Sequence, residues 1–363
     1  SDTPSGAEGQ WIDGDFVRFR YGQPEKIGGF QAIGQKTIAG PARAQHCWND
    51  LEGRKYAALG TSKALYIYYE DAFYDITPLD TAITGATFTS TSSSSTVTVN
   101  KATHNLEVGD FITFSSVTIP GTSSFVATDF TSFTFEILTV PTTGTFTITM
   151  QTTETGTPMS STGSAQIDPY VEIGPTIQTY GYGWGTSSWG TVAWGQGSTS
   201  SQVILDPGSW SLDNFGQQLI ATIKDGKTFV WDAGAANPLD TRATLMTGAP
   251  TASRLTIVSD RDRHVVHFGT ETSIGNTTTQ DPMFIRFSNQ EDYNTYEPTS
   301  VNTAGTFRLD TGNKIVAAVS GKDYNLILTD TAAYTMQFVG PPFTFSIRQV
   351  GSNCGCIGQH AVV

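Results

Sequence analysis

Apolar and polar residues alternate in short runs along most of the chain, which is the pattern of half-buried β-strands. Residues 16–21 read FVRFRY, in which Arg18 and Arg20 alternate with Phe19 and Tyr21. Further strands are expected at residues 55–59, 64–69, 72–79, 218–224, 227–231, 262–269, 282–288, 314–320, 325–340 and 343–351. Polar turns separate these runs, and long helical stretches are missing. The pattern therefore predicts an all-β protein.

Two pairs of these strands predict β-hairpins. The first has its turn at Gly60-Thr61-Ser62-Lys63, between strands 55–59 and 64–69. The second has Asp225-Gly226 between strands 218–224 and 227–231, a two-residue turn favoured because glycine tolerates a positive φ. Strand pairs that recur at this spacing are typical of β-propeller blades, although the sequence does not repeat itself, so a two-sheet sandwich stays open.

A change of composition near residue 81 indicates an inserted domain. A Ser/Thr-rich segment there runs into about five strands separated by polar turns. We expect a small inserted β-barrel or β-sandwich domain in this region. The predicted organisation is N-terminal propeller hairpins at 1–81, the insert at 82–170, a Gly/Trp-rich extended arm at 171–200 and further blades at 201–363. The last residues, GQHAVV, resemble the start of a strand, so we expect the propeller to be incomplete in this chain.

Charge and cysteine usage restrict the classes of function. The net charge is −13 and the pI about 4.7, whereas a protein that grips nucleic acid needs a basic face. An acidic surface could instead line a passage along which DNA slides. The thiols of Cys47, Cys354 and Cys356 are expected to be reduced, because so few cysteines do not form a secreted disulfide framework. No signal peptide is visible, and no apolar run approaches the ~18 residues of a membrane span.

Histidines and cysteines offer two possible metal sites, and neither is favoured. His264 and His267 are three apart on an expected strand and would point to opposite faces, with one exposed and one packed. Cys354, Cys356 and His360 lie close in sequence without an evident fourth ligand for zinc. The sequence therefore predicts no metal site and no cofactor.

Paired acids give the only candidates for catalysis. Asp13 and Asp15 form one pair, and Asp260 and Asp262 form another. Such pairs can bind calcium or cleave glycosides, but in β-rich proteins they more often cap turns. Arginines interleave the second pair and can neutralise it. We therefore expect no catalytic residue and no enzyme activity.

The segment GYGWGTSSWGTVAWG at 181–195 places Trp184, Trp189 and Trp194 each before a glycine. Such a run could stack on sugars, wedge into a membrane or form a packing seam. Because glycines allow bends that can re-aim the rings, we expect an extended arm whose tryptophans are buried in the propeller or a neighbouring subunit. The candidate packing or inter-subunit residues are Trp184, Trp189, Trp194, Tyr182, Phe338 and Phe343.

Several longer phrases resemble a known family. They are WIDGDFVRFRYGQPEKIGGFQ (11–31), ATHNLEVGDFITFSS (102–116), YGYGWGTSSWGTVAWG (180–195), FIRFSNQEDYNTYEP (284–298) and ILTDTAAYTMQFVGPPFTFSIRQVGSNCGCIG (327–358). In this order they resemble the tail hub or nozzle proteins of short-tailed, podovirus-type bacteriophages, which are similar to packaged-DNA-stabilisation proteins.

The resemblance implies a β-propeller-based structural protein of the virion, assembled in the host cytoplasm. It implies a homo-oligomer of six copies around the DNA channel, which helps retain packaged DNA and allows its ejection. Implied partners are adaptor or portal-proximal tail proteins, tail fibres or spikes, and genomic DNA that passes through the lumen without tight binding. Two alternatives stay open, namely a carbohydrate-binding adhesin or tail-fibre module and a glycan-degrading propeller enzyme that uses Asp260 and Asp262.

Overall fold

The fold is built almost entirely from antiparallel β-strands, as the sequence predicts. The computed structural model describes residues 14–29, 31, 38–176, 206–341 and 343–362. Within these ranges the other regular elements are helix α1 (Ala127–Thr131) and the 3-10 helices η1 (Pro238–Asp240) and η2 (Thr277–Thr279). No helix among the described residues is long and apolar enough to cross a membrane.

Four sheets have the same plan, in which four strands consecutive in sequence lie side by side in order. The first contains β3 (Ala42–Asn49), β4 (Lys55–Thr61), β5 (Leu65–Tyr69) and β6 (Ala72–Asp75). The second contains β14 (Trp210–Phe215), β15 (Gln218–Ile223), β16 (Thr228–Asp232) and β17 (Thr244–Leu245). The third contains β18 (Leu255–Ser259), β19 (His264–Phe268), β20 (Phe284–Phe287) and β21 (Gly305–Arg308). The fourth contains β22 (Ile315–Ser320), β23 (Asn325–Thr329), β24 (Ala332–Gly340) and β25 (Thr344–Ser352).

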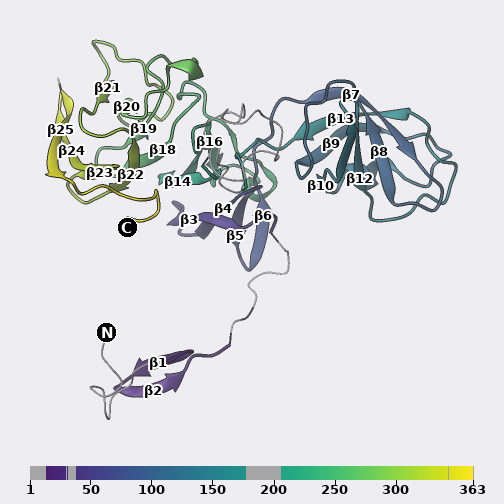
Figure 1. The fold of residues 1–363 in the computed structure, drawn as a ribbon, viewed down its shortest axis with the longest axis horizontal. Coiled ribbons are helices and arrows are strands. Elements are labelled where there is room, and N and C mark those ends of the chain that lie inside the picture. The colour runs from purple at the N-terminus through teal and green to yellow at the C-terminus, as the bar shows by residue number, and fades with distance from the viewer. Residues whose placement is uncertain (1–13, 30, 32–37, 177–205, 342, 363) are drawn as a thin grey trace, which may run out of the picture.

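Successive sheets pack on one another through shared cores. Trp48 of the first sheet and Trp210 and Trp231 of the second belong to one apolar cluster. A second cluster joins the second and third sheets, and a third joins the third and fourth. The first strands lead these contacts, because β14 contacts both β3 and β18, and β18 contacts β22 (Figure 1).

Burial on both faces explains why β18 and β19 carry no alternating pattern. Every residue of these two strands is buried, and His264 and His267 are each 0% exposed. The prediction of one exposed and one packed histidine is therefore wrong. The side chains do face different surroundings, since His264 packs among aromatic rings and His267 lies in a hydrogen-bonded network.

Residues 83–169 form a separate seven-stranded sheet that curls around its own core. Its strands lie in the order β10-β9-β13-β7-β8-β12-β11. They are β7 (Ile83–Ser90), β8 (Thr96–Asn100), β9 (Phe111–Thr118), β10 (Phe135–Glu136), β11 (Thr139–Thr142), β12 (Thr145–Thr149) and β13 (Thr162–Pro169). Seven strands are present where about five were expected, and one reason is that the segment 133–140, expected as one strand, contributes to both β10 and β11, which pair with β9 and β12 respectively. The sheet is a curled half-barrel, and α1 packs against it beside β9.

The turn at Asp225-Gly226 differs from the expected two-residue type. Asp225 has a φ of +56°, and the amide of Ile223 donates to the carbonyl of Lys227. The loop is therefore longer than two residues, and aspartate rather than glycine takes the left-handed conformation. Gly226 instead pairs with Ser253, next to the third sheet.

A two-stranded hairpin lies apart from all these sheets. It consists of β1 (Val17–Arg20) and β2 (Gln23–Lys26), paired antiparallel (Figure 1, purple, lower left). All eight strand residues are exposed.

Candidate functional site

The junction between the curled sheet and the four-stranded sheets holds a polar site that joins three sheets. The chain leaves the first sheet after β6, passes through the curled sheet and returns at Tyr170. The two connecting segments lie antiparallel, with Leu79 bridged to Tyr170. The Asp80 amide donates to the Pro169 carbonyl at 2.8 Å and the Val171 amide donates to the Pro78 carbonyl at 3.1 Å. This pairing fixes where the curled sheet begins.

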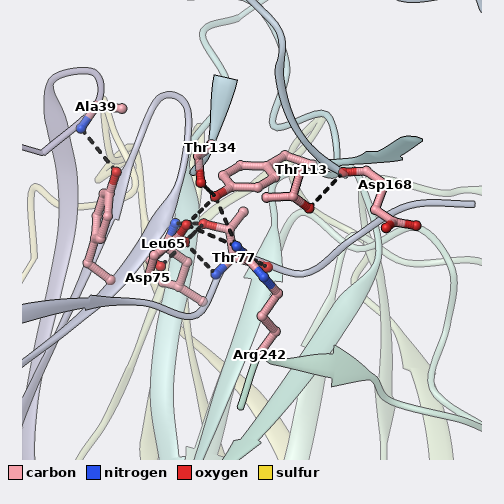
Figure 2. A network of polar contacts seen from close by, with 10 residues as sticks. Ala39, Leu65, Asp75, Thr77, Thr113, Thr134, Asp168 and Arg242 are labelled. Carbon is pink, nitrogen blue, oxygen red and sulfur yellow. Dashed lines mark hydrogen bonds and ion pairs between the residues drawn. The ribbon is translucent and has the colours of Figure 1, made fainter. Parts of the chain in front are cut away.

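A network of side chains ties the curled sheet to the first and second sheets (Figure 2). The Tyr170 hydroxyl donates to Asp75, and it lies 3.0 Å from the hydroxyl of Thr134. Arg242 donates to the Tyr170 hydroxyl at 3.1 Å, to Asp75 at 3.3 Å and to the Thr77 carbonyl at 2.8 Å. The guanidinium also lies 4.8 Å from the centre of the Tyr170 ring. One arginine therefore joins three segments that are far apart in sequence.

The electrostatics of this network favour a neutral tyrosine between two charges. Burial, followed by the nearby charge of Asp75, raises the pKa of Tyr170 well above its ordinary value. Burial acts to lower the pKa of Arg242, but the charges of Asp75 and Tyr170 and the hydrogen bonds to both residues together outweigh it, so that pKa is raised. The arginine therefore remains charged and the phenol keeps the proton that it donates. This arrangement suits a permanent structural joint, since neither Tyr170 nor Arg242 is poised to exchange a proton near neutral pH.

A groove of about 710 Å³ opens beside this joint. Its lining includes the carboxylates of Asp80, Glu107, Asp110 and Glu172, together with Lys63, which is the one cationic side chain among the lining residues. Apolar lining comes from both sides of the junction and includes Ile83, Leu106, Val108, Phe111 and Ile173. The groove is thus both acidic and partly apolar.

His104 adds a buried donor to the lining of the groove. Its residue is 3% exposed, and its ring packs edge-on against Phe146 at 5.1 Å. The Nδ1 atom accepts from the amide of Leu106 at 3.1 Å, so the ring proton lies on Nε2. Within the described part of the chain Nε2 has no hydrogen-bond partner.

The structure places only two of the expected packing residues. Phe338 is half-buried and packs against His264 and Phe345, with ring centres 5.7 Å apart in each pair, so its contacts are within the chain. Phe343 is 79% exposed in the turn between β24 and β25. The remaining candidates lie outside the described residues: Tyr182, Trp184, Trp189 and Trp194.

The structure places one of the two acid pairs in a turn. Asp260 and Asp262 lie in the tight turn between β18 and β19, where the Asp262 amide donates to the Ser259 carbonyl at 3.2 Å. Asp262 is buried, and burial raises its pKa. Asp15 is exposed, and Asp13 lies outside the described residues.

The histidine and cysteine candidates are dispersed. His267 contacts Ser253 and Thr256 through Nδ1, at 3.1 and 3.0 Å, and the Tyr296 hydroxyl through Nε2, at 3.1 Å. Cys354 is exposed and Cys356 is half-buried, and both are free thiols, as is Cys47. The part of the chain that the structure describes contains no group of three or more His, Cys, Asp or Glu side chains that could hold a metal ion.

Comparison with known proteins gives distant structural similarity. No family model matches the chain, and no curated protein matches it. Among solved structures, the chain is similar to the phage phi92 endosialidase, with 14% sequence identity and a TM-score of 0.29. The match covers 92% of this chain and 53% of the endosialidase chain, so this chain spans about half the length of that protein. A TM-score of 0.29 does not establish a shared fold.

Proposed function

We propose that this chain is a structural, non-catalytic subunit of a phage tail hub or nozzle, which assembles as a ring around the DNA channel. In this proposal the four four-stranded sheets are blades of a β-propeller, and the curled sheet at residues 83–169 is a domain inserted between the first and second blades. The ring would help to retain packaged DNA and would open for its ejection. Its partners would be further copies of the chain, adaptor or portal-proximal proteins, and tail fibres or spikes.

The observation that carries the proposal is the repeated use of the first strand. In each four-stranded sheet the chain runs from one edge to the other without a crossover, and the first strands contact one another in the order β3, β14, β18, β22. Sheets that share cores face to face, with their first strands adjacent, are the arrangement of propeller blades around an axis. The phrases that resemble tail hub proteins support the same assignment independently of this geometry.

The charge of the chain fits a channel wall better than a DNA-binding surface. A net charge of −13 repels phosphate, so DNA could pass such a wall without being retained along it. Retention would then depend on a local constriction rather than on attraction. Asp260 and Asp262, the pair named in the glycosidase alternative, lie in the turn between β18 and β19, as expected of acids that cap turns.

Electron microscopy of the particle that contains this chain tests the proposal directly. We expect a ring of copies around the tail channel, with an acidic or neutral lumen. A strongly basic lumen, or a chain located only at a fibre tip, would contradict it. Binding to a glycan array that is lost on Trp189→Ala would favour the carbohydrate-binding adhesin instead.

A further inference from the structure

The hairpin β1–β2 is a two-stranded sheet with little burial of its side chains. All of its strand residues are exposed, and the residues that flank β1 are aromatic and open, with Phe16 69% exposed and Tyr21 91% exposed. An isolated hairpin is at best marginally stable in water, and exposed apolar side chains that gather in one place mark interaction sites. The hairpin therefore has the properties of an arm that is completed by another surface.

The charge of this arm is opposite to that of the whole chain. Between Val17 and Lys26 the sequence contains three cations, Arg18, Arg20 and Lys26, and one carboxylate, Glu25. Arg18 is paired with Glu25 at 3.1 Å, so Arg20 and Lys26 supply the net positive charge. A partner surface for this arm should combine carboxylates with exposed apolar area.

The groove beside the junction meets that description. Glu107 and Glu172 are exposed carboxylates in its lining, whereas Asp80 lies 3.9 Å from Lys227; Val108, also in the lining, is 62% exposed. The groove is therefore acidic and partly apolar, which favours an occupant that is basic and carries exposed apolar side chains.

We infer that the hairpin β1–β2 of one copy binds the acidic groove of a second copy. This inference rests on the proposed self-assembly and names the surfaces that join its subunits. The fifteen residues between Lys26 and Ala42 can span at most about 50 Å, which allows the arm to reach a neighbouring subunit. In a ring, each copy donates one arm and accepts another, which closes the assembly without leaving a free arm or groove.

A charge-swap experiment on the full chain tests the inference. Arg20→Glu with Lys26→Glu reverses the arm and leaves the Arg18–Glu25 pair intact, whereas Glu107→Lys with Glu172→Lys reverses the groove. We expect each pair of substitutions to weaken self-association at least tenfold in sedimentation velocity at about 50 mM salt. The chain with all four substitutions should recover it, because the opposite charges are restored.

A matched control reverses two charges elsewhere, through Lys322→Glu with Arg348→Glu, both exposed. It should self-associate like the unchanged chain. Tyr21→Ser offers a second variant that removes apolar contact without altering charge, and it should also weaken association.

The outcomes separate the arm from the ring. Assembly that persists in the Arg20→Glu, Lys26→Glu chain overturns the inference and leaves the proposed ring standing. Failure of the four-substitution chain to recover also overturns the pairing of these two surfaces. An unchanged chain that stays monomeric at all concentrations overturns both the arm exchange and the self-assembly on which it rests.

Discussion

Acidification should destabilise the four packed four-stranded sheets through His267, and the size of the effect follows from the burial of this side chain. His267 is fully buried on β19 and is bonded through both ring nitrogens to hydroxyl groups. Burial, followed by the charge of Arg286, lowers the pKa of His267 from 6.5 to about 3. The unfolded chain binds the proton near pH 6.5, whereas the folded chain resists it until about pH 3. The contribution of His267 is therefore complete above pH 6.5 and is lost as the pH falls from 6.5 to 3.

The magnitude can be worked out at a pH where the chain is still folded. Going from pH 7 to pH 5 takes the unfolded histidine about 1.5 pH units below its ordinary pKa. Each of these units lowers the free energy of unfolding by roughly 1.4 kcal/mol. We therefore expect His267 to remove about 2 kcal/mol from the free energy of unfolding over this range. His264, whose pKa burial lowers to about 4, adds a comparable loss.

Equilibrium denaturation in guanidinium at pH 7 and pH 5, followed by tryptophan fluorescence, measures this loss. The variant His267→Gln should lose about 2 kcal/mol less than the unchanged chain between the two pH values, even if it is less stable at both. Ser253→Ala is the matched control, because it removes a hydroxyl partner of His267 without removing the titrating group, and its pH dependence should remain close to that of the unchanged chain. An identical pH dependence for His267→Gln and the unchanged chain would refute the reasoning.

Three further substitutions test other parts of the structure. Glu154→Gln should destabilise the curled sheet by about 2 kcal/mol in thermal unfolding, because hydroxyl and amide donors surround this buried carboxylate and lower its pKa to about 2. An unchanged melting temperature would contradict this. Arg242→Lys should lower the free energy of unfolding by about 2 kcal/mol, because lysine cannot reach Asp75 and the other acceptors at once. Limited proteolysis should then cut faster near residues 79–82 and 170–173, and unchanged cleavage would count against the joint. Gly60→Ala should lower the free energy of unfolding by about 1–3 kcal/mol, since the Cβ of the new alanine would lie 2.5 Å from Cδ1 of the buried Trp210 ring. A chain of unchanged stability would show that this contact is loose.

Much of the strand content was predictable from the sequence, and three of the strands that were missed share a physical cause. Alternating or hairpin-linked strands such as β4, β5, β15 and β16 were expected close to their observed bounds. The first strands β3, β14 and β18 were missed. These strands lie where neighbouring sheets meet, so their faces are set by contacts with other sheets rather than by the period-2 alternation of a half-buried strand.

The junction was beyond the reach of sequence reasoning. Asp75, Tyr170 and Arg242 are far apart along the chain, and no local motif marks any of them. The acidic groove shares this difficulty, because its carboxylates come from separate segments that only the tertiary structure brings together. The position of Tyr170 at the expected end of the inserted domain was the one available signal.

The Trp-Gly run remains a prediction, since residues 182–194 lie outside the described structure. The other two packing candidates show that an aromatic residue type does not by itself predict burial. Phe338 is used within the chain and Phe343 is open, although both are aromatic residues at the β24–β25 end of the fourth sheet.

The sequence by itself determined that this protein is all-β, acidic and built from short hairpins, because strand period, turn residues and charge are local properties of the chain. Only the tertiary structure decided that four sheets share cores through their first strands, that both His264 and His267 are buried, and that Arg242 joins three distant segments. These features depend on which surfaces pack together in the folded chain. The burial, the hydrogen bonds and the pKa of a side chain follow from this packing and not from its neighbours in sequence.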